Sequence, residues 1–282
     1  MYSKFDLKIS DDFYNNELSH HLKSGQEIYK EHENTAQKSL REFIYENGHI
    51  DGTSMKNHWF QMEDVDVFLS HSHQDINKIQ ALAGWLYDEF GLTAFIDSCV
   101  WGYCDDLLKE IDDNYCKNSD GNLYAYDLRN YTTSHVHIML STALTEMMDK
   151  TECIMFYNTP NSISLAEDVA TLKKEKKKVT LSPWIYHELA MTSLLESKPK
   201  RKKAILESVL HKAFNADSLP NIEHEVGKYL NDMEPLKDEE LRKWKRNYHS
   251  VHGNKNVHAL DVLYAMPFMT KEVYDDDYGK EI

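Results

Sequence analysis

The stretch VDVFLSHSHQD, residues 65–75, decides the expected fold. It opens with a short apolar run that ends at a polar cluster, which is typical of a buried strand. The next segment, DINKIQALAGWLYDEF (75–90), has apolar residues at helical spacing, and Gly91 is suited to end that helix. LTAFID (92–97) then predicts a second strand. A strand, a helix and a strand in about thirty residues indicate a right-handed βαβ unit, and therefore a parallel sheet.

The chain continues this alternation up to about Pro199. We expect a loop and then a helix over 98–116, a turn-rich insertion over 117–133 and a helix over 134–150. TECIMFYNT (151–159) predicts a third strand, and a loop follows it. The next helix begins at Ser182 and Pro183, a capping residue followed by a proline suited to the first turn. Together these elements predict an α/β domain of three layers with a central parallel sheet over residues 61–235.

The two ends of the chain have a different character. Residues 1–60 are polar, and apolar residues such as Ala36, Leu40 and Phe43 recur at roughly helical spacing. They predict a helical N-terminal extension. Residues 236–282 predict a C-terminal helical segment followed by an acidic tail.

Charge and composition exclude several classes of function. The 282 residues include 32 basic and 47 acidic side chains, a formal net charge of −15, which opposes binding to nucleic acid or to an anionic membrane. No apolar run is long enough to cross a membrane, and no signal peptide is visible. The four cysteines fit free thiols in a reducing compartment. We expect a cytoplasmic protein with neither nucleic acid nor membrane as a partner.

One pair of residues suggests chemistry. In SPWIYHELA (182–190), Trp184 and Glu188 are four residues apart, so a helix places both on one face. A carboxylate there can hold ribose hydroxyls and stabilise developing positive charge, while an indole ring can stack on a cation. The ordinary alternative is a packing tryptophan and a solvated glutamate.

Further candidates follow the first two strands, at the edge where open parallel sheets bind ligands. Ser70, His71 and Ser72 lie between a strand and a helix, where they can receive a phosphate or a ribose, or simply cap the helix. Asp97 ends the second strand, where it can contact substrate or form an Asx turn. In the predicted loop after it, Trp101 and Tyr103 can cover a base or anchor the loop.

The spacing of the cysteines and histidines and the two lysine-rich segments are weaker indications of function. Cys99 and Cys104 lack the spacing of a structural zinc site, and no histidine pair has a known metal-binding spacing, so we expect no metal and no bound cofactor. Lysines concentrate over 173–178 and 198–203 on either side of the helix with Glu188. They can steer a diphosphate, or belong to solvated loops.

Three of these motifs, in order, resemble those of Toll/interleukin receptor (TIR) domains. DVFLSHSHQD (66–75) resembles the first strand and loop, and FIDS followed by CVWGYCDD (95–106) resembles the second strand and the BB loop. SPWIYHEL (182–189) resembles the helix with the catalytic glutamate in NAD-cleaving members. The likeness covers about 61–235 and is nearest to bacterial TIR proteins of antiphage defence, the Thoeris-like type. It implies a flavodoxin-like TIR fold with helical additions at both ends.

The resemblance also implies a reaction, cleavage of the nicotinamide–ribose bond of NAD⁺. Because the pyridinium departs as a neutral molecule, one carboxylate suffices where ordinary glycosidases use two. The implied catalytic residue is Glu188, and NAD⁺ is substrate rather than cofactor. The implied substrate-binding residues are Trp184, Ser70, His71, Ser72, Asp97, Trp101 and Tyr103.

Several questions stay open at the level of sequence. The product can be linear, cyclic or transferred ADP-ribose, and it can act as a signal to a downstream effector. The family implies self-association through TIR domains. One alternative is a non-catalytic TIR–TIR interaction module, and another is an enzyme like the nucleoside deoxyribosyltransferases.

Overall fold

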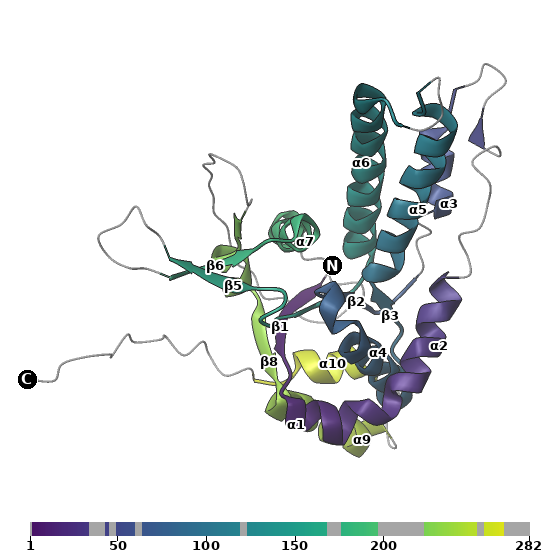
Figure 1. The fold of residues 1–282 in the computed structure, drawn as a ribbon. Coiled ribbons are helices and arrows are strands. Elements are labelled where there is room, and N and C mark those ends of the chain that lie inside the picture. The colour runs from purple at the N-terminus through teal and green to yellow at the C-terminus, as the bar shows by residue number, and fades with distance from the viewer. Residues whose placement is uncertain are drawn as a thin grey trace, which may run out of the picture.

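A five-stranded parallel sheet lies at the centre of the molecule (Figure 1). The computed structural model describes residues 2–33, 43–44, 49–59, 64–118, 123–167, 176–196, 223–252 and 257–267. The strand order is β3–β2–β4–β1–β8, and every neighbouring pair is parallel. The strands are β1 (Ser3–Lys8), β2 (Val67–Ser70), β3 (Ala94–Ile96), β4 (Cys153–Tyr157) and β8 (Glu234–Lys237). The expected α/β architecture with a central parallel sheet is confirmed.

Helices cover both faces of this sheet (Figure 1). Successive strand residues point to opposite faces, so Val67 and Leu69 belong to one core cluster and Phe68 to the other. The first face is covered by α1 (Asp11–Phe13), α4 (Ile76–Phe90), α9 (Asp238–His252) and α10 (Ala259–Tyr264). The second face is covered by α5 (Ser98–Tyr115), α6 (Tyr126–Lys150), α7 (Pro183–Leu194) and α8 (Gly227–Asn231).

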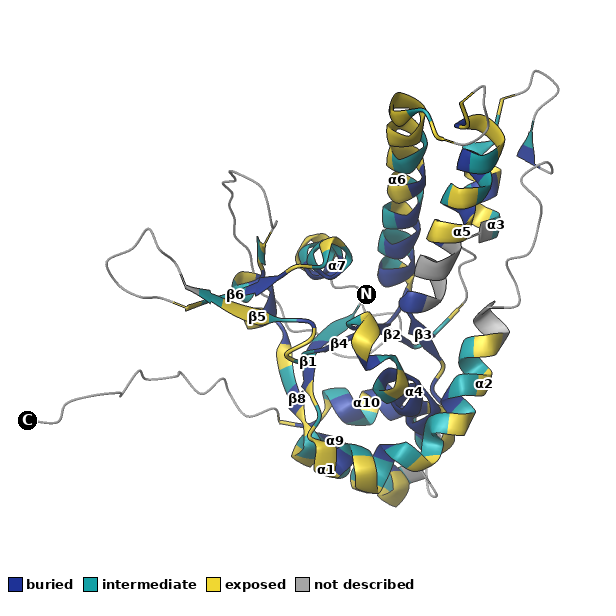
Figure 2. Cartoon of the chain, viewed as in Figure 1, coloured by how far each residue is buried: buried dark blue, intermediate teal, exposed yellow. Residues whose placement is uncertain are grey.

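The predicted βαβ unit is confirmed. β2 leads through a 3₁₀ turn (His73–Asp75) into α4, and the chain returns in β3 beside β2. Gly91 ends α4 in the left-handed region, at φ 67°, and its N–H donates to the carbonyl of Tyr87 at 2.8 Å. Buried residues concentrate on the strands and on α4 (Figure 2).

The prediction that residues 1–60 are a helical extension is wrong for their first residues. β1 lies inside the sheet, with Phe5 opposite Met155 of β4 on one side and Glu234 of β8 on the other. A π-helical turn (Tyr14–Leu18) and a 3₁₀ turn (Ser19–His21) lead from α1 to α2 (Leu22–Glu33), and α3 (Gly52–Trp59) is also helical. Since the partners of β1 are about 150 and 230 residues away in sequence, no local pattern reveals its pairing.

The C-terminal segment belongs to the same core as the sheet. The helices expected after residue 236 are α9 and α10, but β8 extends to Lys237 and pairs with β1. Trp244 of α9 stacks on Phe90 of α4 with ring centroids 4.0 Å apart, and its indole N–H donates to the carbonyl of Ala259 at 2.8 Å. The acidic tail lies outside the described residues.

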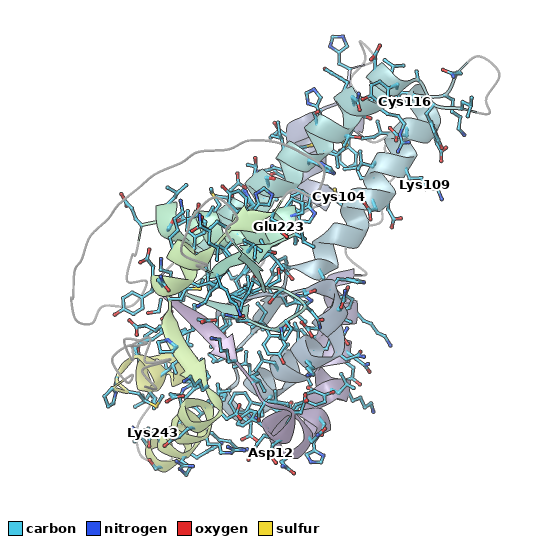
Figure 3. The ribbon with its side chains drawn as sticks, turned by 60° about the vertical axis from the view of Figure 1, so that its left-hand side comes forward. Asp12, Cys104, Lys109, Cys116, Glu223 and Lys243 are labelled. Carbon is cyan, nitrogen blue, oxygen red and sulfur yellow. The ribbon has the colours of Figure 1, made fainter. Side chains whose placement is uncertain are left out.

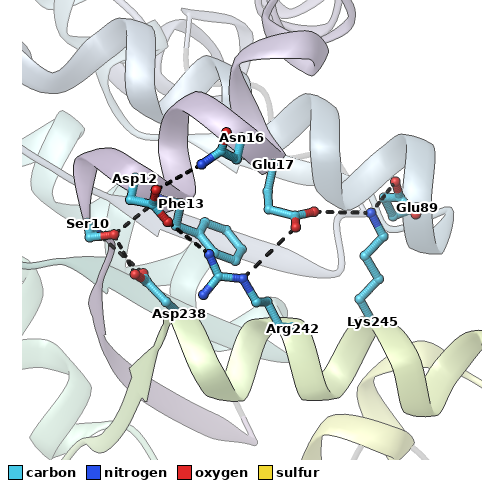
Figure 4. A network of polar contacts seen from close by, with 9 residues as sticks. All are labelled: Ser10, Asp12, Phe13, Asn16, Glu17, Glu89, Asp238, Arg242 and Lys245. Carbon is cyan, nitrogen blue, oxygen red and sulfur yellow. Dashed lines mark hydrogen bonds and ion pairs between the residues drawn. The ribbon is translucent and has the colours of Figure 1, made fainter.

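Polar contacts also join α9 to the N-terminal segment (Figure 4). The Arg242 guanidinium is 3.3 Å from Asp12 and 4.0 Å from Glu17, and the Lys245 ammonium is 3.5 Å from Glu17 and 2.8 Å from Glu89. These half-exposed pairs each contribute little to stability. Their arrangement nevertheless shows that α9 packs against residues 12–17 of the N-terminal segment.

The segments between β3 and α7 differ from expectation in three places. The predicted loop after Asp97 is helical, because α5 begins at Ser98. The turn-rich insertion is shorter than predicted, because α6 begins at Tyr126. The predicted loop after β4 contains β5 (Ser164–Glu167) and β6 (Lys176–Thr180), which form an antiparallel sheet with β7 (His224–Glu225).

Helices α5 and α6 project from the sheet as a long pair, with the free, buried thiols of Cys104 within α5 and Cys116 directly after it (Figure 3). Cys153 of β4 is likewise a free, buried thiol. None of the described helices is both long and apolar enough to cross a membrane.

Candidate functional site

Three of the predicted residues meet at the carboxyl edge of the sheet. Ser70 is the last residue of β2, and Asp97 directly follows β3. Strand alternation places Ser70 on the same face as Phe68, and Asp97 on the same face as Phe95. α7 covers this face and brings Glu188 to the two strand ends.

Local sequence explains how α7 presents this glutamate. The Ser182 hydroxyl accepts from the backbone N–H of Ile185 at 3.2 Å, and Pro183 occupies the first turn, so the helix begins where the sequence predicts. Ile185 and Leu189 pack against Phe156 of β4 in a common cluster. Because Glu188 is next to Leu189 on the buried side, it is carried under the helix rather than into solvent.

The site is a closed cluster of polar side chains. The Ser70 hydroxyl donates to Glu188 Oε2 at 2.6 Å. The backbone N–H of His71 donates to Asp97 Oδ2 at 3.4 Å, and His71 Nδ1 lies 2.6 Å from Asp97 Oδ1. Exposed fractions are 2% for Ser70, 0% for His71, 0% for Asp97 and 1% for Glu188. Water is therefore excluded from all four groups.

Burial changes the protonation of these groups. It raises the pKa of Glu188 well above its usual value, with the nearby charge of Asp97 as the second cause. Burial also raises the pKa of Asp97 to about 8, although a hydrogen bond from Glu188 opposes the rise. For His71, burial lowers the pKa to about 4, against the opposing effect of the carboxylates of Glu188 and Asp75. At neutral pH the imidazole is therefore uncharged, and the carboxyl pair retains at least one proton.

The other predicted residues have different surroundings. Trp184 is half-buried, packs with the core cluster of the second face, and meets the His137 ring of α6 edge to face at 5.4 Å. Ser72 directly precedes the 3₁₀ turn, and its carbonyl accepts the first backbone hydrogen bond of that turn from the N–H of Asp75 at 2.8 Å, but its side chain makes no capping hydrogen bond. Trp101 and Tyr103 fall within α5, and their side chains lie outside the described residues.

Sequence reasoning missed two buried residues near this edge. Ser98, 4% exposed, follows Asp97, and no described group hydrogen-bonds to its hydroxyl. Asp75, 6% exposed, accepts from the Thr159 hydroxyl at 2.6 Å and from the Asn161 amide at 2.9 Å. Both residues follow the first two predicted strands, so their position at that edge of the sheet was the signal in the sequence that could have found them.

The basic segments give little information about the site. Lys173, Lys174 and residues 198–203 lie outside the described residues. Lys177 of β6 pairs with Glu225 of β7 at 3.2 Å, which is an ordinary cross-strand contact. Within the described part of the chain, no group of three potential metal ligands is assembled.

The arrangement has one clear chemical capability. Two carboxyl groups, an imidazole and a hydroxyl share a dry pocket at a sheet edge, where hydrogen bonds and charges act more strongly than in water. If such a site opens to a sugar, its carboxyl groups can bind hydroxyls and stabilise positive charge on a ring carbon.

Comparisons with protein-family models, with curated proteins and with solved structures found no match.

Proposed function

We propose that this chain is a TIR-type enzyme that cleaves the nicotinamide–ribose bond of NAD⁺. Its ADP-ribose-derived product would act as a signal to an effector in bacterial antiphage immunity, within a cytoplasmic, self-associating protein. The observation that carries the proposal is the position of Glu188, whose carboxyl group is 2.6 Å from Ser70 and beside Asp97. Three motifs far apart in the sequence thus supply one cluster.

The proposed reaction requires the site to open. Glu188 is 1% exposed, so NAD⁺ reaches it only if α7 moves away from the strand end that it covers. In the closed state the Ser70 hydroxyl donates a hydrogen bond to Glu188 Oε2, and a ribose hydroxyl would replace this donor after opening. Self-association is a physical means of stabilising the open form, because a partner that binds only that form shifts the equilibrium towards it.

Charge favours a cationic substrate at this position. The closed cluster keeps Glu188 protonated because a buried carboxylate is costly. A nicotinamide ring carries a positive charge, which lowers the pKa of a nearby carboxyl group and favours its ionised form. The bound substrate therefore favours the ionised form of Glu188, which its own cleavage needs. Trp184, one turn earlier on α7, is the proposed stacking surface.

The closed geometry also favours a second candidate, a non-catalytic TIR–TIR interaction module. A fully buried glutamate that hydrogen-bonds to Ser70 and Asp97 can be a structural feature that joins α7 to the sheet. In that case the cluster has no substrate, and substitution of Glu188 alters stability alone.

The test is incubation of the full-length protein with NAD⁺ at high protein concentration, followed by mass-resolved chromatography. We expect release of nicotinamide, and the mass of the second product distinguishes hydrolysis, cyclisation and transfer. Glu188→Gln should reduce turnover at least about 100-fold, as expected for loss of a main charge-stabilising group. Because the closed site holds Glu188 protonated, the neutral amide fits without a large loss of stability.

Glu27→Gln is the matched control, since Glu27 is an exposed carboxylate on α2 with 68% of its side chain accessible. It should retain full turnover. A folded wild-type protein that releases no nicotinamide, even when crosslinked into assemblies, would favour the interaction module. Release of a free base from deoxynucleosides but not from NAD⁺ would instead favour a deoxyribosyltransferase-like enzyme.

A further inference from the structure

Exposed apolar side chains concentrate at the end of the α5–α6 pair that lies farther from the sheet (Figure 2). Among the described residues, eleven large hydrophobic side chains are exposed, and seven of them lie between residues 115 and 138. Single exposed hydrophobic side chains are ordinary, but a group of them in one region marks a surface for interaction. This end of the helix pair is therefore a candidate docking surface.

Three of these side chains form a stripe along α6. Leu128, Tyr131 and Ile138 are 48%, 66% and 67% exposed, and they share the stripe with exposed His135 and Thr142. The successive spacings are three, four, three and four residues, which is the a/d repeat of a coiled-coil seam. The opposite side of α6 packs into the core cluster of the second face. The stripe thus gives α6 a second apolar side, which faces away from the core.

This part of α6 is also poor in charge. Between residues 128 and 142, Arg129 is the only lysine, arginine, aspartate or glutamate, whereas 28% of the whole chain is charged. The Arg129 guanidinium lies 2.8 Å from Asp112 of α5, so its charge is compensated within the chain. The nearest carboxylate along the helix, Asp127, lies at the end of the stripe. Two copies of a chain with a net charge of −15 can therefore meet here without like charges facing each other along the stripe.

We propose that a second copy of this chain docks on the stripe, with the two α6 helices antiparallel about a two-fold axis level with Thr133. Residues equally far from the axis on either side then meet. Leu128 of one copy faces Ile138 of the other, and Tyr131 faces His135. Within one copy the rings of Tyr131 and His135 already touch edge to face, with centroids 4.4 Å apart. Antiparallel pairing therefore brings apolar residues onto apolar residues and rings onto rings.

The size of the stripe suits a weak, reversible dimer. At about 150–200 Å² for each large side chain, Leu128, Tyr131 and Ile138 together expose about 300 Å² per copy. Two copies would bury about twice that area and the polar residues of the stripe, which is the size of a weak, transient interface. We expect a dimer at high protein concentration that dissociates on dilution. The dimer does not rest on the proposed NAD⁺ cleavage, although it would supply the self-association that the proposed function includes.

The test is sedimentation velocity of the full-length protein from low micromolar to near-millimolar concentration. We expect the wild type to pass from monomer to dimer. Leu128→Glu and Ile138→Lys should each weaken the dimer at least about tenfold, because each places an unpaired charge in an apolar seam.

The double variant Leu128→Glu/Ile138→Lys tests the direction of pairing. The two positions are about 15 Å apart along one helix, so the new side chains cannot pair within a copy. Antiparallel helices place the new glutamate of one copy beside the new lysine of the other, so the double variant should dimerise more strongly than either single variant. Parallel helices would place like charges together, and the double variant would then dimerise no better than the single variants.

Tyr87→Glu is the matched control, because Tyr87 is a 51% exposed aromatic residue on α4, which covers the other face of the sheet. It should dimerise like the wild type. Glu188→Gln should also dimerise, so that loss of NAD⁺ cleavage and loss of the dimer are separate outcomes. Thermal unfolding of each variant checks that the fold is intact. The inference is overturned if the wild type stays monomeric at the highest concentration, if Ile138→Lys dimerises unchanged, or if the double variant shows no recovery.

Discussion

The buried carboxyl pair makes the stability of the protein depend on pH in a way that neutral substitutions should remove. The perturbation is the double variant Asp97→Asn/Glu188→Gln, which keeps the shapes of both side chains and removes both titrations. Burial raises the pKa of Asp97 to about 8 and raises that of Glu188 as well. In the unfolded chain both groups ionise near pH 4. The folded protein therefore holds at least one proton that the unfolded chain has released at neutral pH.

The sign and the size of this pH dependence of stability follow from proton linkage. Because the native state binds more protons, its stability falls as pH rises, by about 1.4 kcal/mol per pH unit for each extra proton. Below pH 6.5 this slope is offset, because burial keeps His71 neutral in the folded state while the unfolded histidine takes up a proton. Above pH 6.5 the offset disappears. Between pH 6.5 and 8 the wild type should lose about 2 kcal/mol through this pair.

The assay is urea unfolding of both proteins at intervals from pH 6 to pH 8.5. The informative quantity is the difference between their unfolding free energies, because all other titrating groups are common to both. We expect the double variant to gain about 2 kcal/mol relative to wild type between pH 6.5 and 8. Parallel curves over that range would refute the buried, proton-holding pair.

Two further outcomes test the packing of the fold. Gly84→Ala should destabilise the protein by about 3 kcal/mol or more, because the new Cβ would lie 2.1 Å from the carbonyl oxygen of His21 where α2 crosses α4. Gly52→Ala is its control, since the nearest atom there is 4.0 Å away, and equal urea midpoints for the two variants would contradict the close approach. Deletion of residues 2–9 should abolish cooperative unfolding, because β1 is the strand between β4 and β8 and buries Phe5 and Leu7, at about 1.5–3 kcal/mol each. A truncated protein with a wild-type thermal midpoint would show that this strand is dispensable.

Much of the candidate site follows from local sequence and one rule of sheet geometry. Apolar runs at the start of 65–75 and within 92–97 predicted the strands that the structure has at 67–70 and 94–96, and the cap at Ser182 predicted the helix with Glu188. Because parallel strands end at a common edge, Ser70 and Asp97 were expected near each other. Local patterns did not indicate that Glu188 is completely buried. A surface glutamate and a buried one have the same helical spacing, and only the packing of α7 against β4 distinguishes them.

By itself, the sequence determined the elements that short-range physics encodes, namely the βαβ unit around residue 70, the glycine cap at Gly91 and the proline-started helix α7. Tertiary structure alone decided the sheet partners of β1, the burial of Asp75 and the meeting of Lys8 with Lys237. The reason lies in sequence distance. The periodicity of apolar residues indicates contacts of a residue within a few turns. A strand six residues long contains no local pattern that identifies partners more than 140 residues away.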